Sequence, residues 1–98
     1  MLTKVNAIDQ VSKRLHELSS IADPFVLIEV STIERPFGWV FFYNSKNFLT
    51  TGIARYRLAG NGPVIFNKFS GAMEFHGSDK ALDELITDYE KRLALDSL

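Results

Sequence analysis

The sequence contains no cysteine, so neither a disulfide bond nor a cysteine-based metal site can support the fold. Its two histidines, His16 and His76, are far apart in the chain and lack the spacing of paired metal ligands. We therefore predict no metal site and no cofactor. The absence of cysteine also fits a cytoplasmic protein, where thiols stay reduced.

Long apolar runs and an excess of charge of one sign are missing as well. No stretch approaches the roughly 18 apolar residues that span a bilayer, and the chain turns polar at Asn6, Asp9 and Gln10, without the apolar core of a secretory signal. Lysine and arginine number 11 and aspartate and glutamate 12, so no global field would attract nucleic acid or an anionic membrane. We expect a cytoplasmic protein whose partners are neither nucleic acid nor membrane.

Catalytic motifs are sparse. No Gly-x-Ser-x-Gly nucleophile elbow occurs, and the glycine-rich segment 58–63 lacks the Gly-Lys-Ser/Thr ending of a phosphate-binding loop, so we predict a tight turn there. A Ser/His/Asp grouping assembled by folding stays open, because its members are distant in sequence. A pocket joining His76 to a carboxylate with a perturbed pKa would favour a small enzyme. Without it, we predict a protein that is not an enzyme.

The chain has the size and composition of one small globular domain. It has 98 residues, of which 46% are hydrophobic and 23% charged. A chain of this length buries roughly 65% of the surface that it exposes when unfolded. We therefore expect one domain, residues 1–98, with one modest core and an undetermined oligomeric state.

An amphipathic helix is predicted near each end of the chain. Apolar residues spaced by three and four indicate the first, which Thr3 or Asn6 would cap and Ser19-Ser20 would end: Val5, Ile8, Val11, Leu15 and Leu18. The second, capped by Ser78 or Asp79, has its own apolar side: Ala81, Leu82, Leu85, Ile86, Tyr89 and Leu93.

The residues between the helices have β patterns. Strands are expected at 25–30, 39–43, 64–66 and 73–75, with turns at 35–38 and 67–71. The strands are too close for helical crossovers, so the sheet should be antiparallel. This predicts an α+β fold with about four strands and both helices packed on one face. Segment 45–61 is either an irregular loop or contains a helical turn at 53–57.

The aromatic strand Gly38-Trp39-Val40-Phe41-Phe42-Tyr43 should point alternate side chains to opposite sides of the sheet. Trp39, Phe41 and Tyr43 would share one face. Phe41 and Phe42 are predicted to lie in the core. Trp39 and Tyr43 fit either the core or an interface, because both have polar tips and are enriched at interfaces. The triplet 55–57 alternates arginine with tyrosine, a pattern that can stack on bases. Because it is short, isolated and offset by acidic residues elsewhere, we instead expect a solvated loop with one buried tyrosine.

Two blocks in this order and at this distance, "GWVFFYNSK" at 38–46 and "LAGNGP" at 58–63, together with Thr51-Gly52 and the turn at Ser70-Gly71, resemble the immunity protein 35 family, also called YrhB-type domains. The likeness spans about residues 26–75. The family often has Asp-Lys at the hairpin where this chain has Asn67-Lys68, and asparagine makes the same local turn bond.

The resemblance implies a small α+β protein that binds a cognate bacterial toxin and silences it in the producing cell, without chemistry of its own. A stand-alone stress or chaperone-like role, also attached to some YrhB-type members, is the alternative. From residue type and expected exposure, we expect these residues to contact the partner: Trp39, Tyr43, Asn44, Lys46, Arg55, Tyr56 and Arg57.

Overall fold

The computed structural model describes residues 1–97 of the chain. Its helices are α1 (Lys4–Leu18), α2 (Lys46–Thr51) and α3 (Leu82–Asp96), with two 3-10 turns, η1 (Glu29–Ser31) and η2 (Ala54–Tyr56). Its strands are β1 (Phe25–Leu27), β2 (Ile33–Arg35), β3 (Gly38–Phe41), β4 (Tyr43–Ser45), β5 (Asn61–Asn67) and β6 (Met73–Gly77). The α+β class and the helix near each end of the chain are therefore confirmed.

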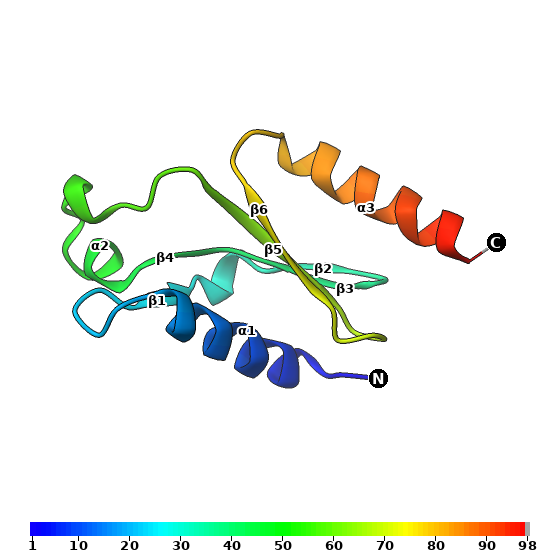
Figure 1. Ribbon diagram of the computed structural model, residues 1–98, viewed down its shortest axis with the longest axis horizontal. Coiled ribbons are helices and arrows are strands. Elements are labelled where there is room, and N and C mark those ends of the chain that lie inside the picture. The colour runs from blue at the N-terminus through cyan, green and yellow to red at the C-terminus, as the bar shows by residue number, and fades with distance from the viewer. Residues whose placement is uncertain (98) are drawn as a thin grey trace.

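The strands form two antiparallel sheets. Four of them pair in the order β2-β3-β5-β6, and β1 pairs with β4 beside them. Only Phe42 separates β3 from β4, so the expected strand at 39–43 divides between the two sheets. The ribbon continues from β3 into β4 and extends the molecule toward α2 (Figure 1).

The two long helices lie on opposite faces of the four-stranded sheet, with α1 below it and α3 above it (Figure 1). The prediction that both pack on one face is therefore wrong. Trp39 and Phe41 of β3 share a buried cluster with residues of α1, whereas Val40 joins Ile86 and Tyr89 of α3. Because β3 is apolar on both faces, each face needs its own cover, and one helix covers each.

The two helices differ from their predicted details. Thr3 caps α1 with Asn6 in a reciprocal capping box, so both suggested residues take part. The apolar stripe was misplaced at Val5, which is 75% exposed, while Ala7 is fully buried. At α3 the N-cap position is Ala81, without a side-chain hydrogen bond, so the predicted caps Ser78 and Asp79 were wrong.

The turns predicted at 35–38 and 67–71 are confirmed. The tight turn predicted at 58–63 is wrong, because β5 begins at Asn61. The turn after Arg35 joins β2 to β3, a pairing in which Arg35 lies opposite Gly38. A Cβ at Gly38 would collide with the carbonyl oxygen of Phe66, so the neighbouring strand requires glycine there. The loop between β5 and β6 contains Gly71, whose φ is 77°. Strand β2 was not predicted, because its three residues leave little periodicity to detect.

Segment 45–61 contains more structure than expected. Of the two alternatives for this segment, the structure selects the helical turn at 53–57, which is present as η2, but α2 before it was missed. The hydroxyl of Ser45 accepts a hydrogen bond from the backbone N–H of Phe48 and starts α2, and Gly52 ends it with φ 70°. These two signals were present in the sequence, but the helix is too short to have an apolar period.

Candidate functional site

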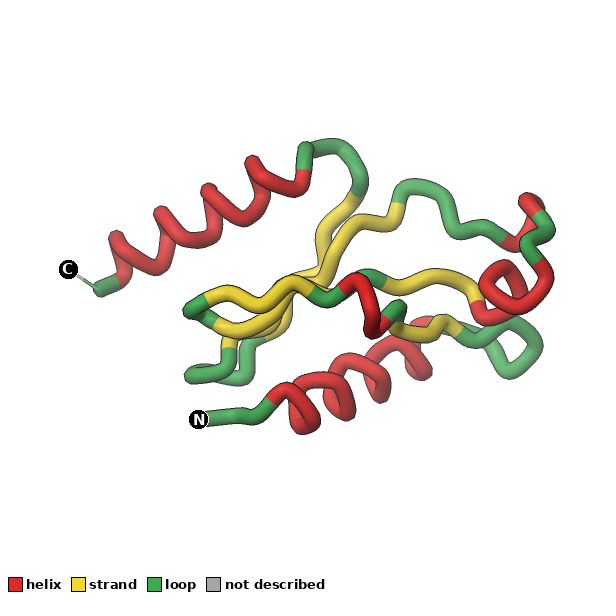
Figure 2. Tube along the Cα trace, turned by 180° about the vertical axis from the view of Figure 1, so that it is seen from behind, coloured by secondary structure: helices red, strands yellow, loops and turns green. Residues whose placement is uncertain are grey.

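Six of the seven residues expected to contact a partner lie in β4, α2 and η2 or directly after them. These elements form one end of a molecule that measures 47 × 27 × 21 Å (Figure 1). Figure 2 shows the same end from behind, with the two short helical segments beside each other and away from α3. We call residues 43–57 the α2–η2 end.

Trp39, the seventh residue, lies in the core. The residue is only 6% exposed and packs with Phe41 and Phe66 against α1. Its ring centroid is 6.5 Å from that of Phe41 and 6.3 Å from that of Phe66. Of the two alternatives that the sequence left open for Trp39, the structure therefore selects the core.

Tyr43 and Asn44 are half-buried and support the surrounding backbone. The ring of Tyr43 packs between Phe25 and Phe75, each 6.1 Å away between centroids, and burial raises the pKa of its hydroxyl. The side-chain oxygen of Asn44 accepts hydrogen bonds from the backbone N–H groups of Ser45 (2.8 Å) and Leu58 (3.0 Å). Asn44 thus ties the segment after η2 back to β4.

The remaining four residues place charged and aromatic groups at the surface of the α2–η2 end. Lys46, Arg55 and Arg57 are exposed, and Tyr56 is half-buried. The guanidinium of Arg55 donates to the Tyr56 hydroxyl (2.9 Å) and lies over its ring, 4.9 Å from the centroid. This places a cation and an aromatic side by side at the surface, a pairing that is common at protein interfaces.

The loop before β1 braces the α2–η2 end. The hydroxyl of Ser45 donates to the carboxylate of Asp23 while it caps α2. The side-chain amide of Asn47 donates to the carbonyl of Ala22 (3.0 Å), and the backbone N–H of Lys46 donates to the carbonyl of Pro24 (2.8 Å). Sequence reasoning missed these bracing contacts, since they join segments more than twenty residues apart.

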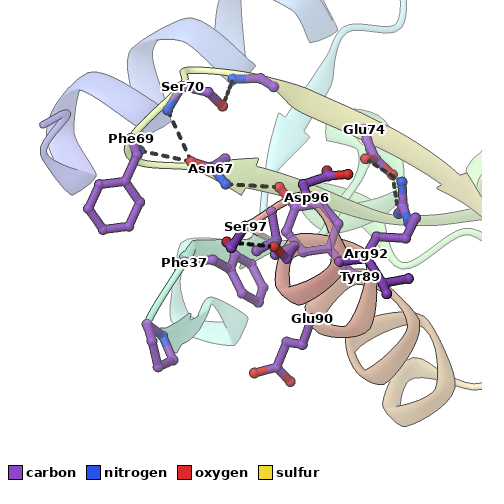
Figure 3. A pocket seen from close by; sticks show the side chains of 14 residues that line it. Phe37, Asn67, Phe69, Ser70, Glu74, Tyr89, Glu90, Arg92, Asp96 and Ser97 are labelled. Atoms are coloured by element: carbon purple, nitrogen blue, oxygen red, sulfur yellow. Dashed lines mark hydrogen bonds and ion pairs between the residues drawn. The ribbon is translucent and has the colours of Figure 1, made fainter.

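A groove of about 930 Å³ lies at the opposite end, between the two hairpin turns and the last turns of α3 (Figure 3). Phe37, Phe69 and Tyr89 line it together with Leu93 and Leu95. The groove is wide and open, and its walls are mainly apolar. Its polar groups largely bond to one another, as Asn67 does with Tyr89 and Arg92 with Glu74 (Figure 3).

The cluster that would favour an enzyme is partly present. A smaller groove of about 570 Å³ contains His76, Glu74 and Arg92, and Nε2 of His76 lies 3.3 Å from Oε1 of Glu74. Hydrogen bonds from Arg92 hold the pKa of Glu74 below its ordinary value. A carboxylate tuned as a general base would have a raised pKa, near the working pH. The arrangement is therefore that of an ion pair joining α3 to β6.

Two kinds of feature are missing from residues 1–97. Within this range, no three histidine or acidic side chains come together as they would to hold a metal ion. None of the described helices has the length and apolar character needed to cross a bilayer.

The protein is thus a small α+β domain with exposed basic residues gathered at the α2–η2 end. The chain belongs to the Immunity protein 35 family, whose model matches residues 5–85. It is also similar to the Escherichia coli (strain K12) protein described as "Uncharacterized protein YrhB", with 38% identity over 86 residues, or 88% of this chain and 89% of the relative. No solved structure matches the chain.

Proposed function

We propose that this protein is a cytoplasmic immunity protein that binds a cognate bacterial toxin and neutralises it by direct contact, protecting the cell that makes the toxin. The observation that carries the proposal is the family match over residues 5–85. Neutralisation would come from covering or distorting the toxin's active site, so the immunity protein would perform no chemistry of its own.

The exposed residues of the α2–η2 end support a binding role. We propose that Lys46, Arg55, Tyr56 and Arg57 contact the toxin, while Tyr43 and Asn44 hold the backbone that presents them. A typical interface buries about 800 Å² per partner with a few aromatic or arginine anchors. The described protein exposes 6278 Å², so an interface of that size is readily accommodated.

The test begins with a pull-down from the native host and identification of the partner by mass spectrometry. The partner is then purified, and its affinity, stoichiometry and activity are measured with and without the immunity protein. We expect one-to-one binding in the nanomolar range and loss of the partner's toxic activity. Weak binding to many unfolded proteins would instead favour the chaperone-like alternative, and would overturn the proposal.

A triple variant, R55A/Y56A/R57A, tests the surface. We expect it to lower affinity at least tenfold, because interface energy concentrates in arginine and aromatic anchors. The matched control, K4A/K13A/K91A, removes exposed cations from α1 and α3 and should bind normally. Unchanged affinity and protection in the first variant would exclude residues 55–57 from the interface.

A further inference from the structure

The acidic residues of this chain are absent from its middle. Between Glu34 and Glu74 there is no aspartate or glutamate, yet five basic residues occur there: Arg35, Lys46, Arg55, Arg57 and Lys68. The formal net charge of the whole chain is -1, so this segregation is invisible in the overall composition. The fold gathers three of the five, Lys46, Arg55 and Arg57, at the α2–η2 end.

Within residues 1–97, these three cations have no carboxylate partner. Lysine and arginine elsewhere often form ion pairs, as Lys13 does with Asp9, Arg35 with Glu90 and Lys80 with Asp88. Within the described part of the chain, no carboxylate lies within 4.0 Å of the charged groups of the three cations. The nearby carboxylate of Asp23 is occupied by the hydroxyl of Ser45. Their charge therefore contributes little to folding and is available to a partner.

Apolar side chains accompany the charge. Leu49 of α2 and Ile53, just before η2, are 44% and 45% exposed. Two half-exposed apolar side chains among cations and a tyrosine match the composition of an interface, where an apolar centre has a polar rim. The contact between Arg55 and Tyr56 holds the guanidinium in place before binding, which lowers the entropy cost of association.

We propose that the α2–η2 end docks onto an acidic surface of the toxin, with Lys46, Arg55 and Arg57 facing carboxylates and Leu49 and Ile53 at the centre of the contact. This inference rests on the proposed function and specifies the chemistry of the partner's surface. A protein is favoured over nucleic acid because the chain as a whole is not basic: its formal net charge is -1.

The test measures association of the purified partner with the immunity protein at about 50 and 500 mM NaCl. Complementary charges speed association about 10- to 1,000-fold at low salt, and salt removes that gain. We expect the association rate constant to fall at least tenfold between the two salt concentrations. The triple variant K46E/R55E/R57E should lose at least tenfold of the low-salt rate constant while keeping its circular dichroism spectrum.

The matched control is K4E/K68E/K91E, which changes the net charge equally but lies outside the α2–η2 end. Its association rate constant should stay within threefold of wild type. If both variants slow association equally, or if salt has no effect, this inference is overturned while the proposed function stands. If no partner binds at all, the proposed function itself fails.

Two titrations test whether the α2–η2 end binds acidic peptide and whether it binds DNA. In an amide NMR titration with an octaglutamate peptide, the chemical-shift changes should centre on residues 46–57. Equal changes around Lys4, Lys68 and Lys91 would show that the peptide has no preference for the α2–η2 end, which would count against the inference. Titration with a 20-base-pair DNA duplex should show no comparable binding. Tight DNA binding that K46E/R55E/R57E abolishes would assign the surface to nucleic acid and overturn the inference.

Discussion

The side-chain amide of Asn67 donates a buried hydrogen bond to the hydroxyl of Tyr89, 3.2 Å away, while its oxygen accepts from the backbone N–H groups of Phe69 (2.9 Å) and Ser70 (3.0 Å). One side chain thus closes the β5–β6 hairpin and attaches it to α3. The turn bond expected of asparagine at this position is confirmed, and the link to α3 adds to it.

Replacing Asn67 should therefore cost more than removing the Tyr89 hydroxyl. We expect N67A, which removes three hydrogen bonds, to lower the free energy of unfolding by about 3 kcal/mol and Y89F by about 1 kcal/mol, since each lost hydrogen bond contributes roughly 1 kcal/mol. N67D should be milder than N67A, because a carboxylate still accepts from the turn, and its second oxygen accepts from the tyrosine hydroxyl once that hydroxyl becomes the donor. Urea unfolding measures all three, and equal losses for N67A and Y89F would show that the turn bonds contribute nothing.

A second link to α3 is sensitive to pH. The guanidinium of Arg92 donates to both carboxylate oxygens of Glu74, over 2.9 and 3.1 Å, and holds the pKa of Glu74 below its ordinary 4.5. Because the folded pKa is the lower one, the pair stabilises the fold above the ordinary pKa. That stabilisation is lost as pH falls through the folded pKa.

We therefore expect E74Q to be less stable than wild type by under about 1 kcal/mol at pH 7, because the pair is partly solvated. The difference should shrink as the pH falls below the ordinary pKa of 4.5. Urea unfolding at pH 7 and pH 3 measures it, with E17Q in the exposed Arg14–Glu17 pair as control. A difference that stays constant across this range would contradict the role of the ion pair.

The face of α1 provides a matched comparison between two valines. Val11 is fully buried and Val5 is 75% exposed, although the apolar spacing placed both on one stripe. We expect V11A to lower the free energy of unfolding by about 2 kcal/mol through the cavity that it leaves. V5A should be neutral or slightly stabilising, because alanine favours the helix. Comparable losses in both variants would contradict the difference in burial between the two valines.

Val5 also illustrates what the sequence could predict. The three-and-four spacing identified the helix, but a rotation of one residue position changes which face points inward, and only contacts with the sheet decide it. Ala7 is buried in place of Val5, since its small side chain suits a helix close to the aromatic residues of β3. The same limit applies to α3, whose side of the sheet depends on chain path rather than on local pattern.

The residue types of the candidate site could be predicted from the sequence, but the contacts that bring its segments together could not. The residue types at 46 and 55–57 indicated a polar contact surface, and the structure brings their elements to one end of the molecule. The bracing contacts of Asp23 and Asn47 could not be predicted from local sequence patterns, because they join distant segments. Trp39 was ambiguous for another reason: tryptophan is equally suited to a core and an interface.

Replacing the two glycines of segment 58–63 with alanine should lower the stability of the fold by different amounts. A Cβ at Gly62 would collide with the carbonyl oxygen of Gly77, whereas Gly60 faces open space and has φ 77°. We expect G60A to cost about 1 kcal/mol for the left-handed backbone, and G62A to cost more, because strands β5 and β6 would have to separate. Thermal unfolding ranks the two variants. The reverse order would mean that the strands do not approach closely at Gly62.

Replacing Trp39 tests whether this residue stabilises the fold or contacts the partner. Its 6% exposure predicts that W39F lowers the free energy of unfolding by about 1–2 kcal/mol, because phenylalanine leaves part of the space beside Phe66 unfilled. Below the unfolding transition, the folded variant should bind the captured partner within twofold of wild-type affinity, unlike R55A/Y56A/R57A. Circular dichroism melts and titration calorimetry make the two measurements. A tenfold loss of affinity with an unchanged melting temperature would place Trp39 in the interface, and the core assignment would be wrong.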